Sequence, residues 1–152
     1  MIRMKWITRA GANVDRIACP WLIKKFVDSQ AEFLFVSASM VKEVAEKENA
    51  IPFDAEGVKS GHYHENGEEY VSFDAIIKKY NLKDAALLEL AKIVRGADAR
   101  VPHDAPPESA GLKATARGFK LLGSDDYDNL ERQFPTYDAL YVHCQLKVQA
   151  AT

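Results

Sequence analysis

The pattern of apolar and polar positions predicts strands in the first third of the chain. Residues 5–9 alternate and carry β-favouring side chains, so they predict a first strand. Residues 32–36 form the clearest apolar run and predict a second strand. Residues 51–53 predict a short third strand, which Pro52 restricts to the edge of a sheet because proline cannot donate a ladder hydrogen bond.

Helical spacing of apolar residues predicts the connections between these strands. Before the second strand, an apolar stripe predicts a helix that Asn13 or Asp15 caps and that Pro20 either starts or kinks. Residues 39–49 predict another helix, so strand, helix and strand form a βαβ-like unit. Residues 54–69 are polar and contain three glycines, and a loop of this length is more often functional than connective.

The second half of the chain has helical periodicity almost throughout. Ser72 and Asp84 are the predicted caps of its first two helices. The helices that we expect in this half cover residues 72–80, 84–97, 108–122, 124–133 and 135 onward. The sequence therefore predicts an α+β fold, with a small N-terminal mixed sheet with helices and a predominantly helical C-terminal half, in a single domain over residues 1–152.

The composition is that of a globular protein. The 152 residues are 47% hydrophobic and 28% charged, which argues against disorder, and a formal net charge of -2 gives no global electrostatic case for binding nucleic acid. Cys19 and Cys144 are too few for a disulfide framework and predict reduced thiols. No apolar stretch approaches the roughly 20 residues that cross a bilayer, and the N-terminus lacks the apolar segment of a signal peptide. We expect a soluble, cytoplasmic protein with no membrane partner.

Charge is unevenly distributed along the chain. Residues 1–30 carry six basic and two acidic side chains, a net of +4, whereas residues 43–69 carry eight acidic and two basic ones, a net of -6. Both segments fit solvated faces. An anion site near the basic N-terminal segment is the alternative interpretation.

Two histidines lie one residue apart in the long polar loop. If that segment is extended, His62 and His64 share a face and can ligate one metal ion, with carboxylates from Glu65, Glu68 and Glu69 nearby. The same residues also fit a solvated polar loop.

A second polar group surrounds the end of a predicted helix and the proline-rich loop after it. It comprises Arg95, Asp98, His103 and Asp104. Neutral imidazole and carboxylates suit zinc, iron or manganese. Alternatively, Asp98 and Asp104 only cap local turns.

A third group, Asp15, Arg16 and Cys19, lies at a predicted helix start. A guanidinium there favours anions and would lower the pKa of the thiol. Alternatively, Asp15 and Arg16 form a structural ion pair and Cys19 is a buried apolar side chain. The sequence contains no phosphate-binding glycine loop, nucleophile elbow or Cys-x-x-Cys pair, so no nucleotide cofactor is indicated.

Several of these segments together resemble the chromate-resistance protein family, in particular the C-terminal domain of the ChrB-type proteins. The resemblance follows the order of the chain over nearly its whole length. The resembling stretches are KWITR at 5–9, DRIACPWLI at 15–23, EFLFV at 32–36, IPFD at 51–54, His62, SFD at 72–74, IVRGAD at 93–98, AGL at 110–112 and YDALY at 137–141 with Cys144.

The resemblance carries expectations about partners and chemistry. Full-length relatives resemble chromate-responsive regulators whose DNA-binding part lies N-terminal to this domain, so we do not expect this chain alone to bind DNA. Other relatives look like fusions to a sulfurtransferase, which indicates redox or sulfur chemistry. The sequence departs from the family pattern at Val71, where the family has cysteine, and at Glu108, where it often has glutamine. The missing thiol argues against a Cys–His pair in the polar loop.

Carried over residue by residue, the resemblance gives a candidate site. It implies functional roles for Asp15, Arg16, His62 and Asp98. His62 and Asp98 would be metal ligands, and the remaining ligands would come from His64, His103 or Asp104. Arg16 would face an oxyanion or a partner carboxylate, and Cys19 would be a soft ligand or redox group. Together with Asp15 and Arg95, these two residues are the candidates for binding an anion or substrate.

Three functions fit these residues. The leading hypothesis is a metal-binding domain in chromate or oxyanion stress resistance, which senses or handles the ion and holds zinc, iron or manganese. The second is a metal-dependent redox or hydrolytic enzyme, which would need an open coordination position. The third is a protein-interaction module without metal, for which a large exposed apolar patch would be the mark. The expected partner is a small oxyanion or a metal ion, and a homodimer is compatible with the sequence.

Overall fold

The computed structural model of this chain describes residues 4–55 and 60–151. Two parts of the sequence predictions therefore lie outside the described residues: the first three residues of the N-terminal segment, and the loop glycine Gly57. The elements in chain order are β1 (Lys5–Arg9), α1 (Asp15–Leu22), the π-helix η1 (Ile23–Val27), β2 (Glu32–Val36), the 3₁₀-helix η2 (Ala38–Met40), α2 (Val41–Glu48), β3 (Ile51–Pro52), β4 (Tyr63–Glu65), β5 (Glu68–Tyr70), α3 (Ser72–Lys79), α4 (Ala85–Asp98), α5 (Glu108–Leu122) and α6 (Asp126–Ala151).

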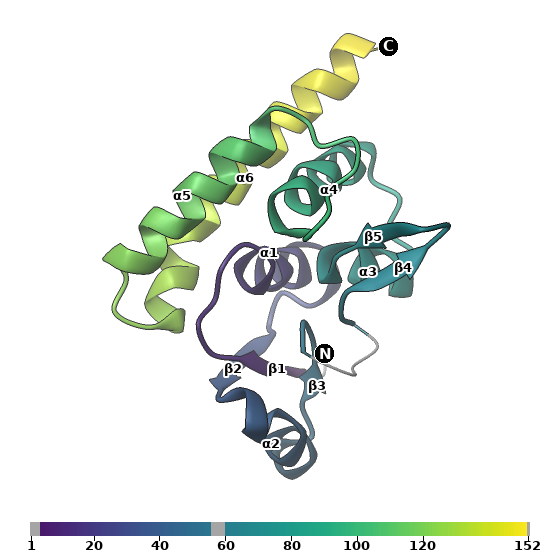
Figure 1. Cartoon of the computed structure of the whole chain (residues 1–152). Helices are drawn as coiled ribbons and strands as arrows, with labels where there is room; N and C mark the ends of the chain where they lie inside the picture. The colour runs from purple at the N-terminus through teal and green to yellow at the C-terminus, as the bar shows by residue number, and fades with distance from the viewer. Residues whose placement is uncertain (1–3, 56–59, 152) are drawn as a thin grey trace.

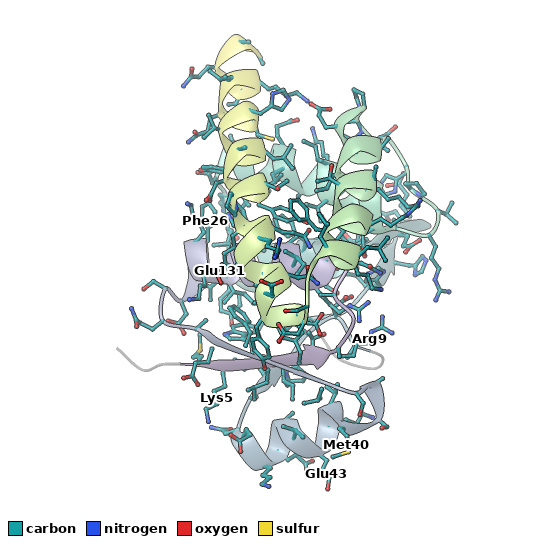
Figure 2. The ribbon with its side chains drawn as sticks, turned by 90° about the vertical axis from the view of Figure 1, so that its left-hand side faces the viewer. Lys5, Arg9, Phe26, Met40, Glu43 and Glu131 are labelled. Atoms are coloured by element: carbon teal, nitrogen blue, oxygen red, sulfur yellow. The ribbon has the colours of Figure 1, made fainter. Side chains whose placement is uncertain are left out.

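The three predicted strands form one parallel sheet in the order β2-β1-β3, which confirms that Pro52 lies on an edge strand. Successive side chains of β1 point to opposite faces. Ile7 joins a small core with Val41 of α2, and Trp6 joins the main core with Ile17 of α1. The sheet therefore separates α2 from α1 and the C-terminal helices (Figures 1 and 2).

The helical half is built on α4, which packs against both α5 and α6. Its predicted cap is confirmed, because the Asp84 carboxylate accepts the Leu87 N–H at 2.9 Å. α4 and α5 lie in close contact at Gly96, where an added Cβ would lie 2.8 Å from the Ala105 Cβ and would also meet the Ser109 side chain. Glycine at this position allows the two helices to meet. None of the described helices is both long and apolar enough to cross a bilayer.

The helical prediction on both sides of Pro135 is confirmed, but the predicted break between two helices there is wrong, because α6 is one continuous helix through that residue. An interior proline costs a helix about 3 kcal/mol in lost hydrogen bonding and steric conflict. Tertiary packing outweighs this cost, since Gln133, Tyr137 and Cys144 on the same helix are buried. Pro20 likewise lies inside α1, and it does not start the helix.

The prediction of an irregular loop over residues 54–69 is also wrong in its second part. β4 and β5 form an antiparallel hairpin, in which the rings of Tyr63 and Tyr70 stack with centroids 5.2 Å apart. Asn66 and Gly67 make the turn, with φ values of 53° and 78°. Paired positive φ angles are typical of a type I′ hairpin, so an Asn-Gly turn signal was present in the sequence.

Candidate functional site

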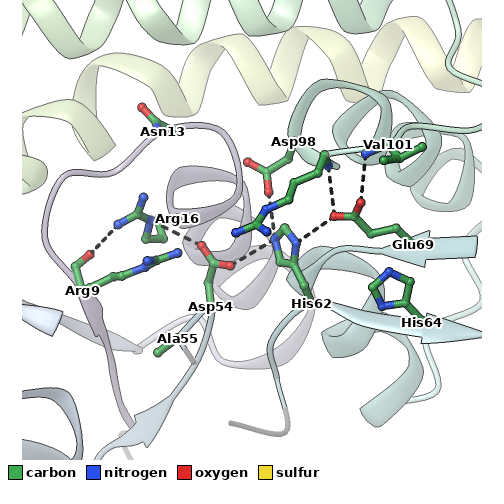
Figure 3. Close-up of a pocket in the computed structure, with 11 residues that line it drawn as sticks. Arg9, Asn13, Arg16, Asp54, Ala55, His62, His64, Glu69, Asp98 and Val101 are labelled. Carbon is green, nitrogen blue, oxygen red and sulfur yellow. Dashed lines mark hydrogen bonds and ion pairs between the residues drawn. The ribbon is translucent and has the colours of Figure 1, made fainter. Parts of the chain in front are cut away.

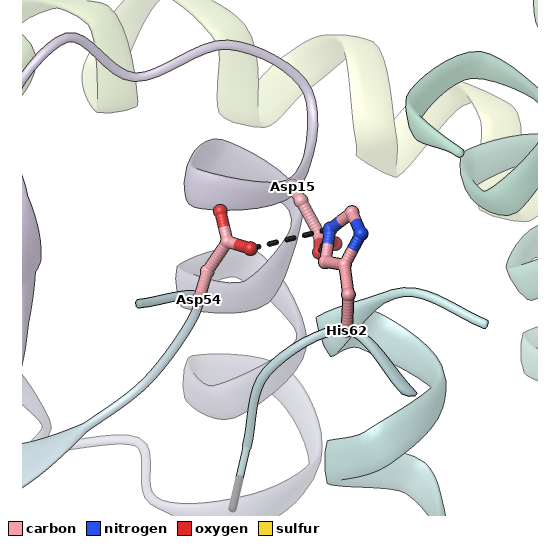
Figure 4. A group of neighbouring side chains, drawn as sticks. All are labelled: Asp15, Asp54 and His62. Carbon is pink, nitrogen blue, oxygen red and sulfur yellow. Dashed lines mark ion pairs between the residues drawn. The ribbon is translucent and has the colours of Figure 1, made fainter. Parts of the chain in front are cut away.

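His62 lies directly before β4, and four carboxylates from separate segments surround its imidazole. The Nε2 atom is 3.0 Å from Asp98 Oδ2, 3.3 Å from Asp54 Oδ1 and 3.5 Å from Asp15 Oδ2. On the other side of the ring, Nδ1 lies 3.4 Å from Glu69 Oε2. The start of α1, the segment after β3, the end of α4 and strand β5 thus converge on one histidine (Figures 3 and 4).

Asp15 also holds the fold together at this point. Its carboxylate accepts hydrogen bonds from the backbone N–H groups of Ser72 at 2.7 Å and Phe73 at 3.2 Å, so it caps the N-terminus of α3 from another helix. The predicted cap by Ser72 itself is therefore wrong, and the Ser72 hydroxyl instead donates to Asp54 Oδ1 at 2.8 Å. The predicted capping of α1 by Asn13 or Asp15 is wrong as well, because Val14 is the N-cap residue and the Asp15 N–H at the helix start is directed at Asp98 Oδ1, 3.4 Å away.

The cluster shifts the protonation of its members strongly. Burial, together with the nearby charge of Asp98, raises the pKa of Asp15 to about 7. Hydrogen bonds to Asp15, Asp54 and Asp98 raise the pKa of His62 to about 12. Burial alone would raise the pKa of Asp54, but its hydrogen bonds with His62 and Ser72 bring it below the ordinary value. At neutral pH the free site therefore contains an imidazolium among carboxylates.

Glu69 fixes the orientation of the histidine. Its carboxylate accepts the backbone N–H groups of Arg100 and Val101, each at 3.0 Å, and it lies on the Nδ1 side of His62. These backbone hydrogen bonds outweigh burial and lower the pKa of Glu69. An ionised Glu69 that accepts Nδ1–H leaves Nε2 directed at the three aspartates, the arrangement that orients histidine ligands in metal sites.

Four members of the cluster, Asp54, His62, Glu69 and Asp98, line the floor of an open cavity of about 850 Å³, and Asp15 is buried in contact with His62. Arg16 forms part of its wall: the guanidinium Nε lies 3.4 Å from Asp54 Oδ2, and Nη1 donates to the carbonyl oxygens of Arg9 and Ala10. The sequence interpretation of an ion pair between Asp15 and Arg16 is therefore wrong, because Arg16 pairs with Asp54. The described residues that line the cavity are Arg9, Asn13, Arg16, Asp54, Ala55, His62, His64, Glu69, Asp98, Arg100 and Val101.

The structure brings together some of the predicted site residues and separates others. Arg16, His62 and Asp98 line the cavity, as does His64 further along the hairpin (Figure 3). Asp15 is buried and contacts His62 (Figure 4). Cys19, Arg95, His103 and Asp104 are not among its described lining residues.

Each of these other residues has a different environment. Arg95 pairs with Asp74 at 2.8 Å, and His103 pairs with Glu68 at 3.1 Å. Asp104 is exposed, with a φ of 49°.

Cys19 lies beneath the site and is fully buried. Its thiol is 3.4 Å from Asp15 Oδ1, to which it donates. Burial and the neighbouring carboxylates raise its pKa well above the usual range. The thiol therefore stays neutral, which contradicts the expectation of a lowered thiol pKa and fits the alternative of a buried apolar side chain.

Two site residues were not singled out from the sequence. Glu69 was noted only as a nearby carboxylate, and Asp54 only as part of a family motif. Asp54 follows β3 and Arg9 ends β1, and the carboxyl ends of parallel strands meet at one edge of a sheet, where ligand sites usually form. The position of Asp54 and Arg9 directly at the ends of two predicted strands was the sequence signal that could have identified them as site residues.

The fold and the cavity define this molecule as an α+β domain with a histidine–carboxylate site at the carboxyl edge of a parallel sheet. The chain belongs to the family of ChrB C-terminal domains, whose sequence profile matches residues 6–144 and therefore includes every residue of the cluster. It is 29% identical over 140 residues to Protein ChrB of Cupriavidus metallidurans, an alignment that covers 91% of this chain and 40% of that protein. The chain thus spans less than half the length of this curated relative. No solved structure matches the chain.

Proposed function

We propose that this chain is a divalent-metal-binding domain that acts in resistance to chromate or related oxyanion stress. The observation that carries the proposal is the contact of His62 Nε2 with carboxylate oxygens of Asp98, Asp54 and Asp15, all within 3.5 Å. Asp15, Asp54 and His62 each offer a ligand atom, and these atoms lie within 4.8 Å of one another. One imidazole nitrogen with carboxylate oxygens suits zinc, iron or manganese.

The charge of the cluster supports a cation at this position. In the metal-free site a single imidazolium and Arg16 face Asp15, Asp54 and Asp98, and the raised pKa of Asp15 reflects the excess of negative charge as well as burial. A divalent ion that replaces the proton on Nε2 supplies one further positive charge. Glu69 would then hold the imidazole as a ligand from the opposite side of the ring.

The open side of the cavity favours a site that exchanges ligands over a closed structural one. The side chain of His62 is 34% exposed, and the cavity of about 850 Å³ leaves room beside the proposed metal. This openness suits a domain that senses or handles an ion, and it also keeps the second hypothesis, a metal-dependent redox or hydrolytic enzyme. The family resemblance gives chromate resistance as the biological setting.

Metal analysis tests the proposal directly. The purified chain is titrated with zinc, iron(II) and manganese(II), and bound metal is counted by mass spectrometry. We expect about one ion per chain, and at least about tenfold weaker binding in His62→Gln and Asp98→Asn.

Two variants are matched controls for these substitutions. His143 is exposed on α6, and Asp104 is exposed in a loop at a positive φ that asparagine tolerates. His143→Gln and Asp104→Asn should bind metal as the parent does. The proposal is wrong if no metal binds saturably, or if the site variants bind as tightly as their controls.

A further inference from the structure

We propose that Arg9 and Arg100 form, beside the metal, a binding site for a tetrahedral oxyanion group, and that this anion binds only to the metal-loaded protein. The inference rests on the proposed metal site and adds a second ligand to it. The anion-binding residues differ from those that the sequence suggested, because Arg95 and Cys19 do not line the cavity.

Two different elements bring the arginines to the cavity. Arg9 ends the central strand β1, and Arg100 follows the end of α4, the helix that carries Asp98. Within residues 4–55 and 60–151, neither guanidinium has an ion pair or a hydrogen bond, although Asp54, Asp98 and Glu69 line the same cavity. Two unpaired guanidinium groups at the wall of a polar cavity are suited to an anionic ligand.

Arg16 gives this wall a fixed shape. Its guanidinium is held by Asp54 and by the carbonyl oxygens of Arg9 and Ala10, and it lies beside Arg9 on one side of Asp54 (Figure 3). Burial and the nearby charge of Arg9 lower the pKa of the Arg16 guanidinium, although the Asp54 carboxylate acts in the opposite direction. An anion next to Arg9 would relieve this repulsion between like charges.

The carboxylates that line the cavity make binding of the anion depend on the metal. Without a metal, an anion that approaches Arg9 also approaches the carboxylates of Asp54, Asp98 and Glu69, and among these Arg16 pairs with Asp54 alone. A divalent ion held among these carboxylates would add positive charge to the cavity floor beside the two arginines. The anion can then contact the metal and the guanidinium groups together.

The separation of the donors favours a tetrahedral group over a planar carboxylate. The proposed metal on the floor, Arg9 on β1 and Arg100 after α4 approach the ligand from different elements. Four oxygens distributed in three dimensions can meet donors on several sides, whereas a carboxylate presents two oxygens in one plane. The cavity of about 850 Å³ admits either a free oxyanion or a phosphate or sulfate group carried on a small molecule.

Calorimetric titration tests the inference on the full chain, both metal-free and loaded with manganese(II) or zinc. Sulfate is the inorganic probe and glycerol phosphate the organic one, with acetate as the planar control and chloride holding ionic strength constant. We expect sulfate or glycerol phosphate to bind only the loaded protein. We expect about tenfold weaker binding in Arg9→Gln and Arg100→Gln, with unchanged metal stoichiometry, and no change in Arg117→Gln on the exposed side of α5.

The outcomes separate the two proposals. Stoichiometric metal without anion binding, equal anion binding in the metal-free protein, tighter binding of acetate, or unaffected arginine variants would each overturn the anion site and leave the metal site standing. A chain that binds no metal removes both. If glycerol phosphate binds more tightly than sulfate, the oxyanion group is carried on an organic ligand, whereas the reverse order identifies a free inorganic oxyanion.

Discussion

The protonation of His62 gives a quantitative prediction for metal binding as a function of pH. The pKa of this imidazole is raised to about 12 by its hydrogen bonds to Asp15, Asp54 and Asp98, so it carries a proton in the metal-free protein at every ordinary pH. A metal ligand must be the neutral imidazole. Binding should therefore release about one proton, and the apparent association constant should rise about tenfold per pH unit.

Asp15 adds a second proton at lower pH. Burial and the charge of Asp98 raise its pKa to about 7, so below that pH its carboxyl group is also protonated and must ionise to bind a cation. Proton release should then approach two per metal below pH 7. Between pH 8 and pH 6 the apparent affinity should fall by two to three orders of magnitude, roughly tenfold per proton and pH unit.

Calorimetry in two buffers of different ionisation enthalpy counts these protons. The count should be about one near pH 8 and rise toward two near pH 6. His62→Gln should lower the count by about one, and His143→Gln, far from the cavity, should leave it unchanged. An affinity that does not vary with pH, or a count near zero at pH 8, would refute the assignment of His62 as a ligand that must first lose a proton.

Three further predictions concern stability. The folded-state pKa of His62 lies above its unfolded value of about 6.5, so the contribution of its ion pairs to stability is complete below pH 6.5 and is lost as the pH rises toward the folded-state pKa. The melting temperature of the metal-free protein should therefore fall between pH 7 and pH 9, and a constant melting temperature would contradict this. Asp15→Ala leaves two amide donors of α3 unpaired and should cost about 2–4 kcal/mol in urea unfolding, so a neutral result would exclude the capping role. Gly118→Ala, in open space on α5, should stabilise by about 0.5–1 kcal/mol, whereas Gly96→Ala should destabilise because of Ala105 and Ser109; equal effects would argue against close packing at Gly96.

The elements that local pattern controls were predictable from the sequence. The strands, the cap at Asp84 and the boundaries of α5 follow from alternation, capping chemistry and apolar spacing. The hairpin was missed because its strands are only three residues long and polar, although Asn66 and Gly67 marked the turn. Helix α6 was divided at Pro135 because local propensity favours a break there, and only tertiary packing keeps the helix continuous.

The site was less predictable than the fold, for a physical reason. Histidines are few in this chain, so His62 and its neighbour His64 stood out, whereas Asp54 and Glu69 are two of 22 acidic residues, most of which could be solvated charges. What distinguishes the site carboxylates is their convergence on one imidazole from four segments, which no local pattern contains. His103, by contrast, was placed in the site by residue type and has its own partner in the hairpin.

The double role of Asp15 determines where this site can be redesigned. Asp15 cannot be replaced without uncapping α3, and Asp54 accepts the hydroxyl of Ser72 at the same helix start. Asp98 ends α4, and within residues 4–55 and 60–151 its carboxylate has one long 3.4 Å hydrogen bond, from the Asp15 N–H, besides its pair with His62. It is therefore the position at which an engineer can exchange a carboxylate for histidine or cysteine, and so shift metal preference toward softer ions, at the cost of that one long hydrogen bond while α3 keeps its cap.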